Sequence, residues 1–253
     1  MQQKKAVRSQ ANERLQGLSG WAVLVAILLI ALTTGPDALA ASASNPATAD
    51  QIHNTLSSTE KAADWRLLFD GESLTGWRTY KQDKPGKGWK VINGELIIDG
   101  RGGDLITKEK FKDFELTFEW KISEAGNSGI KYRTLGSLGL EYQVLDDQKH
   151  RDNKNPTHRA GSLYELVAAQ DSKTLKPVGE WNKGRIFVRG NQIEHWLNGE
   201  KVVEITWGSA DWKNRSQKSK YHKNEGFGSW EGPILLQDHN DPAWYRNLKI
   251  QKL

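Results

Sequence analysis

The sequence predicts an all-β fold, an antiparallel β-sandwich. Apolar side chains occupy every even position of residues 113–122 (DFELTFEWKI), and polar side chains occupy every odd position. Successive side chains of a strand point to opposite faces, so this alternation indicates a strand with one buried face and one wet face. Asn-Gly pairs at 93–94 and 198–199 separate short alternating runs, and both residue types tolerate the positive φ of a tight hairpin turn. No amphipathic run of ten residues after residue 63 indicates a helix.

Short runs of the same texture recur from residue 64 to the C-terminus. On this basis we expect strands at 66–69, 89–92, 95–98, 104–107, 113–122, 128–134, 140–146, 162–167, 184–189, 192–197, 201–205, 233–238 and 245–252. Three long loops interrupt them, at 147–161, 168–183 and 207–232. Loops of this length in a compact domain are usually lids, binding loops or mobile segments.

The N-terminus has the pattern of an export signal. Four basic residues precede an apolar run of 12 residues at 21–32, and Ala-Leu-Ala follows at 38–40. Such a run is shorter than the roughly 20 residues that a membrane-spanning helix needs. We therefore expect residues 1–40 to be a signal peptide of a periplasmic or secreted protein. The alternative is an uncleaved anchor, which would make the leader the only membrane contact. The Ala-, Ser- and Thr-rich residues 41–63 are predicted to be a flexible linker to a domain at 64–253.

Composition excludes some classes of function. The chain has no cysteine, so a disulfide and a lipid-modified cysteine are both excluded. Without the leader, 32 Lys and Arg face 29 Asp and Glu, a net charge of +3 that does not indicate nucleic-acid binding. The 11 tryptophans of the chain suit core packing, and they also suit stacking on sugar rings.

The first candidate site residues lie in residues 139–147. By period two, Glu141 and Gln143 share one strand face, and Asp146 lies at the strand end or after a bulge. The alternative is that Glu141 and Gln143 are the solvent face of an edge strand. Neither reading is specific on its own.

The second candidates are Gln237 and His239, which share a face if their strand continues. Imidazole titrates near neutral pH, which suits proton transfer. His195 lies between apolar residues of its face, so a buried structural role and a site role are equally compatible with the pattern. Arg133 and Tyr164 are either ordinary surface or packing residues, or donors to sugar oxygens.

At these same segments the chain resembles the 3-keto-disaccharide hydrolase family. The resemblance rests on short motifs that occur in order: 68–71 (LFDG), 74–77 (LTGW), 127–130 (NSGI) with Arg133, 139–146 (GLEYQVLD), 159–164 (RAGSLY), 179–182 (GEWN), 195–199 (HWLNG), 232–239 (GPILLQDH) and 246–250 (RNLKI). It implies a jelly roll similar to the concanavalin A-like lectins and glucanases, whose concave sheet holds a saccharide.

The resemblance also implies cleavage of a glycoside that carries a ketone at C3. Removal of the acidic C2 proton, elimination of the C1 substituent and hydration would complete the reaction. Such a route needs a base, an acid and a group that holds the enolate. The base would be His239 or Glu141, and the acid Asp146 or Glu141.

The resemblance places the remaining candidates around the sugar. Arg133, Gln143, Tyr164, His195 and Gln237 would bind the saccharide, and a divalent metal ion could stabilise the enolate. Three alternatives stay open: a two-carboxylate glycosidase using Glu141 and Asp146, a lectin-like binding module, and an accessory domain of an envelope complex.

Overall fold

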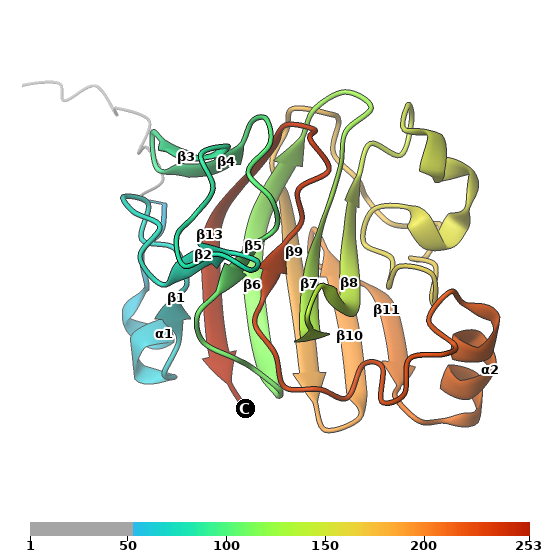
Figure 1. Ribbon diagram of the computed structural model, residues 1–253. Helices are drawn as coiled ribbons and strands as arrows, with labels where there is room; N and C mark the ends of the chain where they lie inside the picture. The colour runs from blue at the N-terminus through green and yellow to red at the C-terminus, as the bar shows by residue number, and fades with distance from the viewer. Residues whose placement is uncertain (1–52) are drawn as a thin grey trace, which may run out of the picture. The chain divides into compact units, whose positions relative to one another are not determined.

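Two antiparallel β-sheets stack face to face in the part of the chain that the computed structural model describes, residues 53–253 (Figure 1). The larger sheet has the order β11-β10-β9-β6-β13-β4-β3, with β1 paired to β13, and the smaller sheet has the order β2-β5-β12-β7-β8. Their bounds are β1 Arg66–Leu67, β2 Trp77–Thr79, β3 Trp89–Ile92, β4 Glu95–Ile98, β5 Leu105–Thr107, β6 Phe114–Ile122, β7 Asn127–Leu135, β8 Leu138–Leu145, β9 Asn182–Arg189, β10 Gln192–Leu197, β11 Glu200–Thr206, β12 Leu235–Leu236 and β13 Ala243–Lys252. The predicted antiparallel sandwich is confirmed.

The core lies between the two sheets. Phe114 and Phe118 of β6 point inward, as the period-two pattern predicts. The ring of Phe114 meets Tyr132 of β7 edge-on at 5.9 Å, and Phe118 meets Tyr142 of β8 at 5.1 Å. Burial of one such side chain stabilises the fold by about 2 kcal/mol, and edge-to-face packing adds to that.

Both predicted hairpins are present. Asn93-Gly94 joins β3 to β4, and Asn198-Gly199 joins β10 to β11. The two asparagines have φ of 52° and 50°, and the glycines 75° and 90°. Positive φ at both central residues is the geometry of the turn that matches the twist of paired strands.

The first described segment, residues 53–63, is folded rather than a flexible linker. The Asn54 N–H donates to Oδ1 of Asn247 at 2.6 Å, and the Asn247 N–H donates back to Oδ1 of Asn54 at 2.8 Å. Helix α1 (Ser58–Ala62) follows and begins with a Ser–Glu capping box. The Ala-, Ser- and Thr-rich composition led to the prediction of a linker. That prediction was wrong for residues 53–63 because composition does not reveal specific hydrogen bonds such as these. The predicted signal peptide and the linker up to residue 52 lie outside the described residues.

Three other elements differ from the sequence prediction. Residues 162–167 form turns with isolated bridges at Leu163 instead of a strand. Strand β2 has only three residues, too few for a pattern, and was not predicted. The predicted loop 207–232 contains helix α2 (Ala210–Lys218), whose only buried residue is Trp212. Among the described residues, no helix is long and apolar enough to cross a membrane.

The outward face of the smaller sheet is partly enclosed by loops. The segment after β8 carries the 3₁₀ helices η1 (Arg151–Lys154) and η2 (Pro156–His158) and lies beside β8, while α2 lies next to β11 (Figure 1). The N–H of Tyr164 donates to the carbonyl of Glu141 at 3.0 Å, so this segment adds to the free edge of β8. These loops convert an exposed sheet face into a lined hollow.

Candidate active site

A hollow of about 110 Å³ opens on the outward face of the smaller sheet. We call its lining the polar cluster, which comprises Asn127, Lys131, Glu141, Gln143, Asp152, Tyr164, Lys220, Tyr221, Gln237 and His239. Strands β7 and β8 supply four members, the chain after β12 supplies two, and the enclosing loops supply four. The structure thus brings together five of the eight predicted site residues, namely Glu141, Gln143, Tyr164, Gln237 and His239.

Glu141 is a buried acid at the centre of the polar cluster, with 4% of its side chain exposed. Its register partner across the sheet is Lys131, whose Nζ lies 3.7 Å from Oε2 of Glu141. The carboxylate lies over Gly129, where a Cβ atom would come within 2.5 Å of Oε1. Burial raises the pKa of Glu141 to about 7, against the opposing charge of Lys131. A carboxyl group with this pKa carries a proton in a large fraction of molecules at neutral pH.

Gln237 links the acid to the imidazole. With its amide oriented to satisfy its neighbours, the nitrogen donates to Oε1 of Glu141 at 3.1 Å, and the oxygen accepts from Nζ of Lys131 at 3.1 Å. The same amide nitrogen lies 2.9 Å from Nε2 of His239. Glu141, Gln237 and His239 therefore form one continuous hydrogen-bonded group.

His239 reaches solvent at the rim of the hollow. Partial burial against the cluster lowers the pKa of His239, and the charge of Lys131 lowers it further, so the neutral imidazole is favoured. The preceding residue, Asp238, fixes the chain because its carboxylate accepts the backbone N–H groups of Gly102 and Gly103 at 2.8 and 2.7 Å. The imidazole is thus held at the rim in the form that can accept a proton.

Gln143 offers an acceptor to a ligand. Its Nε2 donates to Oδ1 of Asn127 at 3.1 Å, and its side chain is 1% exposed. Its Oε1 accepts no hydrogen bond from any residue of the described chain. A buried acceptor in this state destabilises the protein, so a donor such as a sugar hydroxyl would bind there favourably.

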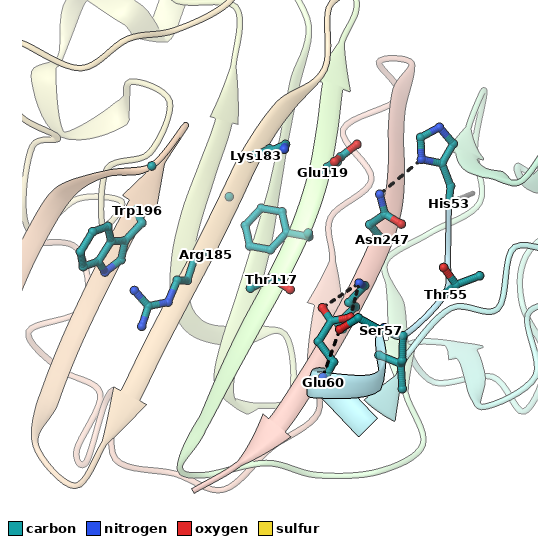
Figure 2. A pocket seen from close by; sticks show the side chains of 15 residues that line it. His53, Thr55, Ser57, Glu60, Thr117, Glu119, Lys183, Arg185, Trp196 and Asn247 are labelled. Carbon is teal, nitrogen blue, oxygen red and sulfur yellow. Dashed lines mark hydrogen bonds and ion pairs between the residues drawn. The ribbon is translucent and has the colours of Figure 1, made fainter. Parts of the chain in front are cut away.

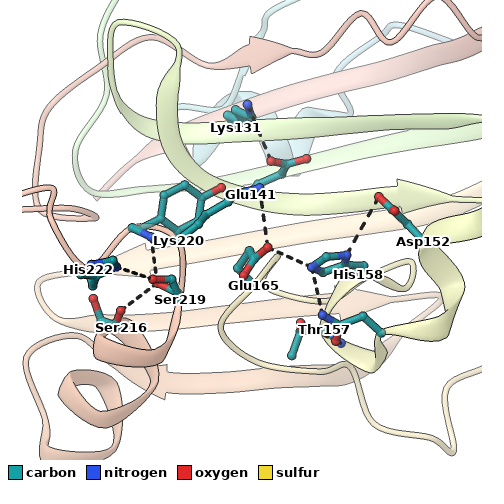
Figure 3. Close-up of polar contacts among 12 residues, drawn as sticks. Lys131, Glu141, Asp152, Thr157, His158, Glu165, Ser216, Ser219, Lys220 and His222 are labelled. Atoms are coloured by element: carbon teal, nitrogen blue, oxygen red, sulfur yellow. Dashed lines mark hydrogen bonds and ion pairs between the residues drawn. The ribbon is translucent and has the colours of Figure 1, made fainter.

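Two loop segments meet beside Glu141, one carrying His158 and Glu165 and the other carrying Lys220 (Figure 3). The ring of His158 stacks on Tyr164 with centroids 4.3 Å apart, and Nζ of Lys220 lies 4.3 Å from the Tyr164 centroid. Lys220 also lies 3.7 Å from Oε1 of Glu165, to which His158 is bonded at 3.1 Å. Sequence reasoning missed Lys220 because residues of long loops follow no periodicity that would assign them to a face.

Arg133 lies outside the polar cluster, contrary to its predicted role in substrate binding. Its guanidinium donates to the carbonyls of Lys112 at 3.0 Å and Gly228 at 3.1 Å, and it forms an ion pair with Asp113 at 2.8 Å. The register of β7 shifts after Tyr132, and Arg133 has a φ of +46°, so the bulge redirects the side chain. Arg133 fastens loops together and does not face the hollow.

Asp146 also lies outside the cluster, contrary to its predicted role as the acid. Its carboxylate accepts the backbone N–H groups of Ala125 at 2.7 Å, Gln148 at 2.9 Å and Lys149 at 3.3 Å. These bonds hold the turn that follows β8, so the buried carboxylate is committed to structure.

His195 is in the core between the two sheets and does not line the hollow. The Tyr132 hydroxyl lies 2.8 Å from its Nε2, and the carbonyl of Gly161 lies 3.1 Å from its Nδ1. Burial lowers the pKa of His195 to about 4, so the ring stays neutral. Of its two predicted alternatives, the structure supports the buried structural hydrogen-bonder.

The residues of the cluster do not form a metal centre. Within residues 53–253 no group of three or more His, Asp or Glu side chains could hold a metal ion. The acids and the imidazole that line the hollow are Glu141, Asp152 and His239, and the cationic Lys131 beside Glu141 competes with a metal ion for that carboxylate. These residues therefore do not fit a divalent metal ion.

The sequence and the fold both match known proteins. Residues 64–251 match the family model of the 3-keto-alpha-glucoside-1,2-lyase-like domain. The chain belongs to this family. Over 225 residues it is 34% identical to a 3-keto-disaccharide hydrolase from Bacteroides thetaiotaomicron, a match that covers 74% of this chain and 77% of the relative.

Two solved structures from Parabacteroides distasonis, each described as a candidate glycosyl hydrolase, share the fold of this family member. The first has a TM-score of 0.74 at 31% identity and covers 79% of this chain and 99% of its own. The second has a TM-score of 0.60 at 25% identity and covers 75% of this chain and 99% of its own.

Proposed function

We propose that the polar cluster cleaves glycosides that carry a ketone at C3, by elimination followed by hydration. The family and the relative make the chain a glycoside-cleaving hydrolase. The observation that carries the proposal is the contact chain from Glu141 through Gln237 to His239. It joins two titratable groups whose pKa values are shifted in opposite directions, raised for the acid and lowered for the base.

The proposed chemistry begins with the acidity that a C3 ketone gives to the C2 proton. A base removes this proton, and the electron pair forms an enolate with its charge on O3. The ketone then re-forms as the C1–C2 double bond forms and the C1–O bond breaks, with a proton delivered to the departing oxygen. Water adds at C1 and a proton returns to C2, so the products are a 3-keto sugar and an alcohol.

The protonation states assign the two roles. Neutral His239 at the rim accepts the C2 proton, and protonated Glu141 donates to the departing oxygen. The free Oε1 of Gln143 accepts a hydrogen bond from a sugar hydroxyl. A conventional pair of catalytic carboxylates would need a second acid in the hollow. The carboxylate of Asp146 is outside it and already accepts hydrogen bonds from backbone N–H groups.

Export is part of the proposal and rests on the basic start, the apolar run and the Ala-Leu-Ala of residues 1–40. A 3-keto glycoside would then be met in the periplasm or outside the cell. A lectin-like module on the same sandwich is the competing function, and it would bind the sugar without changing it.

The test is turnover of a 3-keto disaccharide in D₂O, followed by NMR of C2. The wild type should release the second sugar and incorporate deuterium at C2, because the proton that His239 removes exchanges with solvent. His239→Asn should reduce turnover by about 100-fold or more while changing affinity less than about tenfold. His53→Asn, in the segment that lines the groove over the larger sheet, is the matched control and should behave as the wild type.

Two outcomes would contradict the proposal. Cleavage without deuterium at C2 would indicate direct displacement at C1. Binding of the sugar with no cleavage by the wild type would favour the lectin-like module.

A further inference from the structure

Lys131 is the one cation of the polar cluster that the smaller sheet itself supplies. It lies on the outward face of β7, between its register partners Glu141 on β8 and Leu235 on β12. Only 13% of its side chain is exposed. A lysine is rarely this buried unless its charge is paired, so its partners define what it can do.

The ammonium group of Lys131 is not locked to a carboxylate. Its distance of 3.7 Å to Oε2 of Glu141 is longer than a hydrogen bond. Its other contacts are neutral oxygens, the Gln237 amide at 3.1 Å and the carbonyl of Ser137 at 3.4 Å. When Glu141 carries its proton, no anion bonded to Lys131 neutralises this charge. The hollow then holds a preformed positive charge beside the acid and the imidazole.

The proposed reaction develops one negative charge, on O3 of the enolate. An oriented donor in a site shielded from water stabilises such a charge strongly, because little reorganisation is needed at the moment of reaction. A compact ammonium is suited to a single oxygen atom, whereas a guanidinium is suited to a planar pair. The hydrogen bond would strengthen as the ketone becomes an enolate, so it would act on the transition state more than on the bound substrate.

We propose that Lys131 is a catalytic residue that binds the C3 oxygen and stabilises the enolate, and that it thereby selects 3-keto sugars over 3-hydroxy sugars. This inference rests on the proposed function. The resemblance placed Arg133, two residues later, at the sugar oxygens, but the bulge in β7 leaves that side chain outside the cluster.

The test separates proton removal from bond cleavage. A 3-keto C-glucoside has carbon in place of the glycosidic oxygen, so it can form the enolate but cannot release an alcohol from C1. In D₂O the wild type should exchange the C2 hydrogen of this probe. Lys131→Met should slow the exchange by about 10²–10³-fold, while the affinity of the protein for the probe should change less than about threefold.

Further variants keep the result interpretable if the buried Lys131→Met destabilises the fold. Lys131→Arg retains the positive charge and should retain part of the C2 exchange. Binding of the probe to each variant, detected by NMR, reports whether the hollow is still intact. Lys90 is an exposed lysine on the larger sheet that pairs with Asp99. The control variant Lys90→Met should exchange the C2 hydrogen of the probe as fast as the wild type.

The outcomes distinguish the two proposals. Absence of both turnover and exchange in the wild type would overturn the proposed function. An active wild type with Lys131→Met exchanging within about threefold would overturn the role of Lys131 alone. A Lys131→Met variant that shifts the pH dependence of cleavage but leaves exchange intact would also overturn it, because Lys131 would then act only on the pKa of Glu141.

Discussion

The two outward faces of the sandwich differ in how their charges are satisfied. A groove of about 790 Å³ on the larger sheet is lined by charged residues and by Trp196 (Figure 2). Its acids are paired at hydrogen-bond distance, Glu119 with Arg246 at 2.7 Å and Glu60 with Lys249 at 2.7 Å. Burial alone would raise the pKa of Glu60, but hydrogen bonds from Lys249 and from Ser57 lower it.

The hollow on the smaller sheet is far smaller, at about 110 Å³, yet its polar groups are incompletely satisfied. Glu141 has a raised pKa, and Oε1 of Gln143 lacks a donor. Perturbed acids and unpaired buried acceptors are typical of functional sites, whereas neutralised ion pairs are typical of structure. The larger cavity is therefore not the one whose polar groups are left unsatisfied.

The sharpest way to break this comparison is to remove one carboxylate from each face. Glu141→Gln should lower kcat/KM on a 3-keto disaccharide by about 10²–10³-fold, because the departing sugar must be protonated. On a 3-keto 4-nitrophenyl glucoside the loss should stay within about tenfold, because nitrophenolate leaves without a proton. Glu119→Gln is the control on the larger sheet and should stay within about twofold on both substrates. Equal losses for the two variants would show that the faces do not differ as described.

Stability against pH should sharpen the same contrast. The pKa of Glu141 is about 7 in the folded protein against 4.5 for an ordinary glutamate. The folded state therefore binds more protons between these values, and its stability falls as the pH rises from about 4.5 to about 7. Urea unfolding at pH 8 should find Glu141→Gln more stable than the wild type by up to about 3 kcal/mol, and at pH 4.5 nearly equal. A difference that is the same at both pH values would rule out this account of Glu141.

The smallest effect is expected for Glu60, for which the dependence of stability on pH has the opposite sign to that of Glu141. Its folded pKa is lowered, so its contribution is present above pH 4.5 and is lost as the pH falls through the folded pKa. Glu60→Gln should destabilise the protein at pH 7 by up to about 1 kcal/mol, because the ion pair is partly exposed. The destabilisation should vanish in acid unfolding experiments, and kcat/KM should not change. Loss of activity in this variant would make the groove part of the catalytic machinery.

Strand periodicity predicted the part of the site that depends on the sheet. Glu141 and Gln143 share a face because side chains alternate strictly along β8. The pairing of the Gln237 N–H with the Gly129 carbonyl at 2.9 Å continues the ladder beyond β12, which brings Gln237 to that same face. His239, two residues later, follows it to the rim.

The rest depended on features that alternation does not encode. Arg133 was assigned to the wrong surroundings because a bulge with positive φ ends the alternation that the prediction assumed. Asp146 follows the strand end, where a turn captures its carboxylate. Lys220 and Tyr221 come from a long loop about 80 residues further along the chain than Glu141, and only tertiary packing brings them to the hollow.

The paired asparagines at the start of the described chain have a practical consequence. Asn54 is held against Asn247, and His53 lines the groove of the larger sheet, so the chain joins the domain on that side. The polar cluster opens on the opposite side. In a protein shortened to begin at residue 53, a purification tag or a solid support coupled to that residue would thus attach behind the hollow and leave its mouth accessible to a dissolved saccharide.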